Sequence, residues 1–493
     1  MMDLVGRLPF GSRPSPALRG GRTRAGAMRR WDKGLGAEPA GESSPERRAA
    51  ASATARPAAR GGSNVLRRER HQADYSILLA VVALAAIGIL MVFSSSAMHA
   101  YIASDDTLAI VGPQIFWGAL GILVMLVVMR VDYRWLRMVS VPAYAVAIGL
   151  LVLVFVPSLN RVVGGSARWL VVGSLPAVHP AEIAKLALVI YLAHWMANKG
   201  KRISGFWSGT VPFLLIAMPI IALVFKEPDL GTTFVVALAA FTMFFVAGAS
   251  LIQLGAMGAI GLVGVVLVGL RDYQIERIRT FIDPWADPLG TGFHTIQGLL
   301  ALGLGGIFGQ GLGESKLAGG LYLPNAWNDF IFAIIGEEFG FIGAGIVIGL
   351  FVLLACAGIR TALRAPDTFG ALLAAGITAW LCFQAFINIA VVVALLPVTG
   401  ITLPFISAGG SSLLVSFAAA GVLLSISRET LERRPAAEAP AGAGASGKTA
   451  GEPRSTSTTR RSDAAPDRGR GNRGTHLPGP RRRDVDPTPP RRA

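Results

Sequence analysis

Residues 327–335 of this chain read Trp-Asn-Asp-Phe-Ile-Phe-Ala-Ile-Ile, and they join two different kinds of sequence. Before them lies a charged loop, residues 271–328, and an apolar run long enough to cross a membrane follows them. Almost all other apolar runs are joined by short turns, so this loop offers the largest solvent-facing surface between membrane segments. We therefore expect Asp329, at the boundary, to carry the chemistry of the protein.

The composition is that of an integral membrane protein. Hydrophobic residues make up 52% of the 493 residues and charged residues only 15%, which is too apolar for an ordinary soluble domain. A spanning helix needs about 20 predominantly apolar residues. We predict an all-α membrane fold of about ten transmembrane helices, with a large extracytoplasmic loop between spans seven and eight. The predicted spans are residues 75–97, 108–129, 139–156, 180–197, 210–226, 230–248, 251–270, 329–358, 368–396 and 403–427.

Both ends of the chain are basic. Residues 1–73 carry a net charge of +9 and residues 428–493 carry +7, whereas residues 74–427 are neutral. The ends are rich in Arg, Pro and Gly, so we expect two disordered tails, residues 1–73 and 429–493, around a membrane domain of residues 74–428. Basic flanks on a neutral membrane body favour attraction to anionic lipid, and we expect no nucleic-acid partner.

The charges of the turns predict the orientation of the spans. The loop after the first span holds Asp105 and Asp106 and no basic residue. Because cytoplasmic loops carry an excess of Lys and Arg, both termini are predicted to be cytoplasmic and residues 271–328 to face outside. The basic turns, after spans two, four and eight, hold Arg130, Arg134, Arg137, Lys199, Lys201, Arg202, Arg360 and Arg364.

Glu182 and Lys185 are ionisable residues inside the fourth predicted span. A charge at the centre of a span costs roughly 3 kcal/mol, so we expect the pair to have a structural or functional role that offsets this cost. The i, i+3 spacing lets the two side chains meet on one helix face. Two interpretations stay open with equal weight: an intrahelical ion pair that neutralises itself, or the polar lining of a cavity that receives an anionic headgroup.

Asp229 lies just ahead of the sixth predicted span, in the sequence Lys226-Glu227-Pro228-Asp229. A short carboxylate at this position can accept hydrogen bonds from the free backbone N–H groups of the first helical turn. We favour helix capping over catalysis for this residue.

Arg271, Arg277 and Arg279 open the outer loop. Arginine suits bidentate contact with phosphate, so these residues are candidates to hold a diphosphate at the membrane surface. Ordinary solvation at the interface explains them equally well. The glycine-rich residues 303–320 are not a dinucleotide-binding motif, because no strand precedes them and the loop lies outside the cell.

Asp329 opens the eighth predicted span, and Glu337 and Glu338 follow about 12 Å deeper on the same helix. A carboxylate at the mouth of an apolar cavity is partly desolvated, which raises its pKa and makes it a stronger base toward a hydroxyl. Capping of the helix through Asn328-Asp329 is the alternative, and the spacing gives the two equal weight.

Small residues and prolines interrupt the last two apolar runs, at residues 397–400 and 404–412. Non-helical backbone at membrane depth is tolerated where it is buried in protein or lines a polar cavity. Ser407 and Ser412 lie in this region and are candidates for a site that faces the outer loop. Close helix packing by small residues explains the pattern nearly as well.

These motifs, in this order, resemble the SEDS family of bacterial cell-wall proteins from Asp74 to Arg428. The loop sequence at residues 308–315 and 322–324 is more similar to that of the division members of the family than to that of the elongation members. Two positions depart from the family pattern: His179-Pro180-Ala181-Glu182 stands where the family has Gln-Pro-Ser-Glu, and Asn328-Asp329 where it has Thr-Asp. The matching motifs are Met91-Val92-Phe93-Ser94-Ser95-Ser96, Arg168-Trp169-Leu170, Pro180-Ala181-Glu182, Pro228-Asp229-Leu230-Gly231-Thr232, Asn328-Asp329-Phe330-Ile331-Phe332 with Glu337-Glu338, and Pro404-Phe405-Ile406-Ser407 with Gly409-Gly410-Ser411-Ser412.

The resemblance implies a peptidoglycan glycosyltransferase that polymerises lipid II in septal cell-wall synthesis, with a class B penicillin-binding protein as its transpeptidase partner. Asp329 matches the family's essential loop aspartate. Glu182 and Lys185 match its charged pair, with Arg168 ahead of them. The resemblance also implies a multi-pass protein of the bacterial plasma membrane, located at the division septum, whose tails are candidates to bind other division proteins.

We expect Asp329 to take the proton from the acceptor sugar's hydroxyl while that sugar attacks the donor sugar with inversion. A divalent cation, Mg²⁺ or Mn²⁺, on the lipid diphosphate is an option, although the sequence shows no ligand cluster that demands one. Two rival functions stay open, a lipid II flippase and a non-catalytic division scaffold. The candidates for substrate binding are Arg168, Glu182, Lys185, Arg271, Arg277, Arg279, Glu338, Ser407 and Ser412.

Overall fold

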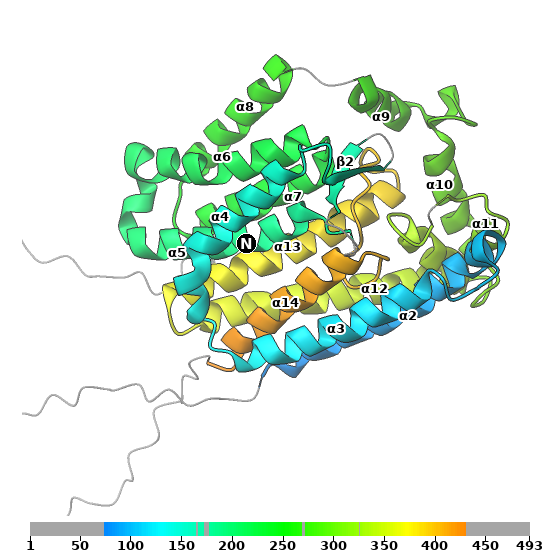
Figure 1. Ribbon diagram of the computed structural model, residues 1–493, viewed down its shortest axis with the longest axis horizontal. Coiled ribbons are helices and arrows are strands. Elements are labelled where there is room, and N and C mark those ends of the chain that lie inside the picture. The colour runs from blue at the N-terminus through cyan, green and yellow to red at the C-terminus, as the bar shows by residue number, and fades with distance from the viewer. Residues whose placement is uncertain (1–72, 164–165, 172–176, 269–271, 325, 430–493) are drawn as a thin grey trace, which may run out of the picture. The chain divides into compact units, whose positions relative to one another are not determined.

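Long apolar helices make up most of the structure, a computed structural model that describes residues 73–163, 166–171, 177–268, 272–324 and 326–429 (Figure 1). Its ten longest helices occupy the positions of the ten predicted spans, with ends that differ by a few residues, and the all-α prediction is confirmed. The helices are α2 (Tyr75–Ser104), α3 (Val111–Arg130), α4 (Trp135–Leu153), α5 (Pro180–Lys199), α6 (Val211–Lys226), α7 (Leu230–Val246), α8 (Leu251–Val268), α12 (Ile331–Arg364), α13 (Thr368–Val392) and α14 (Gly410–Ser427).

Seven helices in the described part of the chain are long and apolar enough to cross a membrane. They are α2, α3, α4, α12, α13, α14, and α6 together with the π-helical turn η3 (Phe206–Thr210) that precedes it. Of the other three predicted spans, α7 has 17 residues, α8 has a shorter apolar run over Leu251–Gly261, and α5 carries Glu182 and Lys185 in its first turns. The length and composition of the helices thus support a multi-pass protein.

The C-terminal helices α13 and α14 form the centre of the bundle. Most of their residues are buried, whereas most residues of α4 face outward. α3 packs along α14, α12 packs against both α13 and α2, and α13 also contacts α5 and α7 (Figure 1). Trp380, Phe405 and Phe417 are among the largest fully buried side chains. Because lipid tails are apolar, the many exposed apolar residues on the outer helices fit a surface that faces lipid.

A short β-hairpin between α4 and α5 was not predicted from the sequence. β1 (Asn160–Val163) pairs antiparallel with β2 (Ser166–Leu170). Leu170 then forms a bridge with Val178, with two backbone hydrogen bonds of 2.8 and 2.9 Å. The bridge places Arg168, on β2, close to the start of α5.

The outer loop is largely helical. It contains α9 (Asp272–Ile282), the 3₁₀ turn η4 (Pro284–Ala286), α10 (Phe293–Gly305) and α11 (Lys316–Gly319). α10 packs along α12, and α11 contacts α2. The loop is therefore held against the membrane helices by elements that the sequence analysis did not predict.

Helix α12 is broken at Gly340, where the sequence predicted one continuous span over residues 329–358. Gly340 has φ 65° and ψ −162°, and a Cβ added there would lie 2.4 Å from the backbone N of Gly309. The outer loop crosses the break and replaces its helical hydrogen bonds: the N–H of Gln310 donates to the carbonyl of Glu337 at 2.9 Å, and the N–H of Phe341 donates to Gly306 at 2.9 Å. The break needs a glycine, because the backbone conformation and the close approach of the loop both exclude a side chain.

Three of the predictions lie outside the described residues. They concern the N-terminal tail up to residue 72, the C-terminal tail from residue 430, and Arg271. These stay predictions.

Candidate functional site

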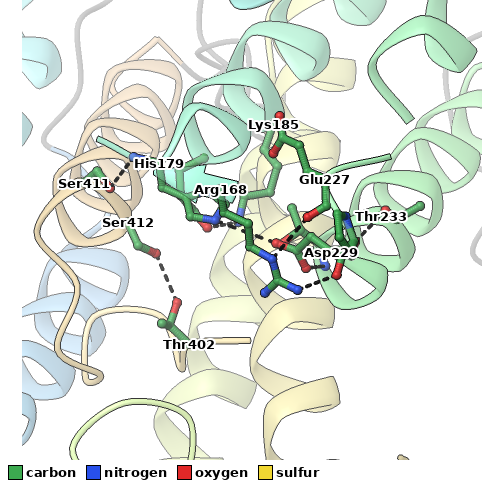
Figure 2. A network of polar contacts seen from close by, with 12 residues as sticks. Arg168, His179, Lys185, Glu227, Asp229, Thr233, Thr402, Ser411 and Ser412 are labelled. Atoms are coloured by element: carbon green, nitrogen blue, oxygen red, sulfur yellow. Dashed lines mark hydrogen bonds and ion pairs between the residues drawn. The ribbon is translucent and has the colours of Figure 1, made fainter. Parts of the chain in front are cut away.

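Arg168 links the β-hairpin to the turn between α6 and α7 (Figure 2). Its Nε donates to the backbone carbonyl of Glu227 at 3.3 Å, and its Nη2 donates to the carbonyl of Pro228. These contacts use one side of the guanidinium group and involve carbonyls rather than carboxylates. Among the described residues, no carboxylate forms an ion pair with Arg168.

Glu227 is a fully buried carboxyl group that the sequence analysis did not single out. Neither carboxylate oxygen has a hydrogen-bond partner among the described residues. Burial raises the pKa of Glu227 to about 8, and the nearby negative charge of Asp229 adds to this, while Arg168 opposes it. Glu227 is therefore expected to be mostly protonated and neutral at pH 7.

Asp229 caps α7, as the sequence analysis favoured. Its Oδ1 accepts a hydrogen bond from the N–H of Thr232 at 3.0 Å. Its Oδ2 lies 3.8 Å from Nε2 of His179, the residue before α5. The backbone N–H of His179 donates to Oγ of Ser411 at 3.3 Å, so the starts of α5, α7 and α14 meet here (Figure 2).

Lys185 and Glu182 form the intrahelical ion pair that was one of the two predicted alternatives. Their Nζ and Oε1 atoms are 2.7 Å apart, and both residues are buried. Lys185 also donates to Oε1 of Gln384 at 2.7 Å. The amide of Gln384 donates to the carbonyl of Thr402 at 3.0 Å, and the hydroxyl of Thr402 lies 3.2 Å from that of Ser412. The pair thus anchors a polar chain that runs from α5 through α13 to the start of α14.

Asp329 lies in the turn before α12 and does not cap that helix. The N-cap residue is Phe330, and no side chain bonds to the first turn. The capping alternative is therefore wrong, because the helix begins two residues later than predicted. Instead, the backbone carbonyl of Asp329 accepts a hydrogen bond from Nδ2 of Asn388 at 2.8 Å, and the same nitrogen donates to the carbonyl of Ile401 at 2.7 Å.

The pKa of Asp329 responds to opposing effects. Burial raises it above the ordinary value, whereas the residue's own backbone N–H, His294 and Arg277 lower it. A carboxylate with a raised pKa is a stronger base than one in water, and the nearby positive charges favour its ionised form. These are the properties required of a general base.

Arg277 lies on α9, in the outer loop. Its Nη1 donates to the carbonyl of Val398 at 3.1 Å, and its guanidinium lies over the Tyr273 ring at 5.6 Å. Burial lowers the pKa of Arg277, and the charge of Arg168 lowers it further, while the charges of Asp329 and other groups raise it. The positive charges of Arg168 and Arg277 act on each other, and two such charges suit an anion with more than one negative charge.

The remaining predicted residues have other positions. Arg279 is exposed on α9. Glu338 accepts a hydrogen bond from the hydroxyl of Ser94 at 2.5 Å and so bonds to α2. The hydroxyl of Ser407 accepts from the N–H of Leu403 at 2.7 Å and thereby supports its own turn. Among the predicted residues, the structure connects Arg168, Arg277 and Asp329 through their charges, and Glu182, Lys185 and Ser412 through hydrogen bonds.

Two buried amides were missed, although the sequence contains a signal for them. Gln384 and Asn388 are spaced i, i+4 in the apolar run of α13, and polar groups at such depth usually face the interior. Among the described residues, no group of three or more His, Cys, Asp or Glu side chains is arranged to hold a metal ion. The divalent cation stays a prediction.

The fold and the site define an integral membrane protein with a polar centre where several broken or short helices meet. Residues 75–432 match the family model for the FtsW, RodA and SpoVE group, described as "Cell cycle protein". The chain belongs to this family, and the predicted SEDS membership is confirmed. It is therefore a multi-pass membrane protein of this family.

Individual relatives match over nearly their whole length. Stage V sporulation protein E of Bacillus subtilis is 43% identical over 358 residues, which cover 72% of this chain and 97% of that protein. The probable peptidoglycan glycosyltransferase FtsW of Trichlorobacter lovleyi is 41% identical over 368 residues, covering 74% and 96%. A solved chain described under "Structural coordination of polymerization and crosslinking by a peptidoglycan synthase complex" is 31% identical with a TM-score of 0.59, covering 72% of this chain and 98% of that one.

Proposed function

We propose that this chain is a peptidoglycan glycosyltransferase that polymerises lipid II into glycan strands during septal cell-wall synthesis. The observation that carries the proposal is the position of Asp329, a half-buried carboxyl group in the turn before α12 whose pKa the charge of Arg277 lowers. Relatives named as probable peptidoglycan glycosyltransferases support the reaction class. The division role is supported by the similarity to FtsW proteins.

Asp329 acts as the general base in this mechanism. The 4-hydroxyl oxygen of the acceptor sugar forms a bond to the anomeric carbon of the donor sugar, and its proton passes to the Asp329 carboxylate. The bond from the anomeric carbon to the lipid diphosphate breaks, and the diphosphate leaves with the electron pair. Attack from the face opposite the leaving group inverts the configuration at that carbon.

Arg168 and Arg277 stabilise the departing diphosphate. Negative charge develops on this group as the bond breaks, and fixed cations in a partly dry site lower the energy of that state. Each arginine is held by hydrogen bonds to backbone carbonyls, so each is positioned before substrate arrives. Lys185 contributes through the ion pair and hydrogen bond that fix the polar chain below the site.

A class B penicillin-binding protein is the proposed partner, which cross-links the strands that this chain makes. The similar solved chain, described as part of a peptidoglycan synthase complex that coordinates polymerization and crosslinking, supports this assignment. The basic turns support a topology in the plasma membrane with both tails in the cytoplasm, where other division proteins would bind. A Mg²⁺ or Mn²⁺ ion bound to the lipid diphosphate would arrive with the substrate.

Polymerisation of lipid II tests the proposal. The purified full-length chain, with a class B penicillin-binding protein, is compared with Asp329→Asn and with Asp106→Asn, which alters an exposed carboxyl in the turn after α2. We expect glycan strands from the wild type and Asp106→Asn and none from Asp329→Asn. Headgroup translocation by this protein alone in vesicles, unaffected by Asp329→Asn, would instead identify a flippase. Full polymerisation by Asp329→Asn would show that Asp329 is not the base.

A further inference from the structure

Tyr273, on α9, links the two arginines of the site. Its hydroxyl donates to the backbone carbonyl of Pro228 at 3.1 Å, and Nη2 of Arg168 donates to the same carbonyl oxygen. The guanidinium group of Arg277 lies over the Tyr273 ring, with 5.6 Å between Cζ and the ring centroid. One neutral side chain thus shares an acceptor with Arg168 and contacts Arg277 directly.

The hydroxyl of Tyr273 has a defined direction. Nε2 of Gln274, a buried residue, donates to the phenolic oxygen at 2.9 Å. A phenol has one proton, and because the oxygen accepts from Gln274, that proton points to the carbonyl of Pro228. The hydrogen bond from α9 to the turn between α6 and α7 is therefore oriented by a second hydrogen bond.

One face of α9 binds two separate segments of the chain. Tyr273 and Arg277 are four positions apart, so their side chains lie on the same side of the helix. Tyr273 bonds to Pro228, before α7, and Nη1 of Arg277 donates to the carbonyl of Val398 at 3.1 Å, between α13 and α14. This face of α9 therefore bridges two segments that are far apart in the sequence.

Uncharged groups make the contacts that hold the two arginines, namely three backbone carbonyls and the phenol ring. In the part of the chain that the structure describes, no carboxylate forms an ion pair with either guanidinium group. A carboxylate would cancel the positive charge, whereas carbonyls and an aromatic ring leave it available for an anion. Because like charges repel each other, two such cations in one site need neutral groups that fix them.

We infer that Tyr273 is a positioning residue that holds Arg168 and Arg277 as a two-cation site for the diphosphate of the lipid-linked donor sugar. The inference rests on the proposed function and on the role of the two arginines in it. The hydroxyl fixes α9 on the carbonyl that also orients Arg168, and the ring supports Arg277. The sequence analysis did not single out this tyrosine.

Binding of short polyprenyl phosphates to the full-length protein in detergent tests the inference. Farnesyl diphosphate is the probe, and farnesyl monophosphate, which carries less charge, is the comparison. We expect Tyr273→Leu, which removes the hydroxyl and the ring, to weaken binding of the diphosphate about 10-fold and of the monophosphate about 2-fold. Tyr273→Phe keeps the ring and should weaken binding of the diphosphate about 3-fold. The matched control is Tyr101→Leu, which alters an exposed tyrosine near the end of α2 and should change neither value.

The ratio of the two dissociation constants separates positioning from a purely structural role. Partial unfolding lowers the amount of protein that binds and leaves the ratio unchanged, whereas loss of the two-cation arrangement lowers the preference for the diphosphate. In the Arg277→Gln background, the effect of Tyr273→Leu should be smaller than in the wild type, because the ring acts through that arginine.

An unchanged ratio in Tyr273→Leu overturns the inference, and so does an undiminished effect of this change in the Arg277→Gln background. In polymerisation assays with the penicillin-binding partner, Tyr273→Leu should lower kcat/KM for lipid II about 10-fold. If the wild type made no polymer from lipid II, the proposed function itself would fail, whereas the binding ratio would still report on the two-cation site.

Discussion

At the residue scale, Glu227 is a buried acid whose pKa is strongly raised. It is fully buried, neither carboxylate oxygen has a hydrogen-bond partner among the described residues, and its pKa is raised from 4.5 to about 8. The unfolded chain releases the proton near pH 4.5, whereas the folded chain keeps it until about pH 8. Between these values the folded state binds more protons, so its stability falls as the pH rises.

Glu227→Gln should remove this part of the pH dependence, because the amide resembles the neutral acid and cannot ionise. Near pH 5 the variant and the wild type should have similar stability. At pH 9 the variant should be more stable, by up to about 4 kcal/mol. Thermal unfolding in detergent at both pH values measures this, with the exposed Glu314→Gln as control. Equal stability of Glu227→Gln and wild type at pH 9 would show that Glu227 is not buried as a neutral acid.

The Glu182–Lys185 pair permits a second prediction at this scale. Lys185 is 2% exposed and Oε2 of Glu182 already lacks a partner among the described residues, so Lys185→Met leaves a buried charge uncompensated. We expect this change to cost about 3–5 kcal/mol, and the double change Glu182→Gln with Lys185→Met to recover most of it. A double-mutant cycle by thermal unfolding tests this. Additive effects of the two changes would mean that the side chains do not interact.

At the element scale, the broken helix α12 connects the membrane helices to the outer loop. Glu337 lies just before the break, and its carboxylate accepts hydrogen bonds from Oγ of Ser315 at 2.5 Å and from the N–H of Lys316 at 2.8 Å, which holds the start of α11. The backbone carbonyl of Glu337 accepts a hydrogen bond from the N–H of Gln310. The break thus binds the glycine-rich part of the loop and helps to determine where Asp329, at the loop's end, is held.

Gly340→Ala should release this segment. The new Cβ would lie 2.4 Å from the Gly309 backbone in a conformation that L residues rarely adopt, so we expect a loss of about 1–3 kcal/mol and faster protease cleavage within residues 306–320. Gly345→Ala is the matched control on the same helix, because nothing lies within 4 Å of its Cβ position. Limited proteolysis in detergent compares the two. Equal cleavage of both variants would contradict the clamping role of the break.

At the scale of the whole molecule, the apolar runs were sufficient to place all ten long helices, because a lipid-facing helix is recognised by composition without knowledge of its neighbours. The family motifs also marked Arg168 and Asp329 as candidates for the site. The sequence could not show what holds these residues, since Arg168 contacts carbonyls about 60 positions away. The capping alternative for Asp329 depended on where α12 begins, and a shift of two residues ruled it out. The break at Gly340 depends on a loop that crosses it, which no local pattern reveals.

The most direct test of the central claim is the single-turnover rate of glycosidic bond formation by Asp329→Asn, with lipid II binding measured on the same protein. Removal of a general base should slow the reaction by about 100-fold or more and leave the affinity for lipid II unchanged. A rate close to that of the wild type, or a loss explained entirely by weaker binding of lipid II, would contradict the assignment of Asp329 as the base.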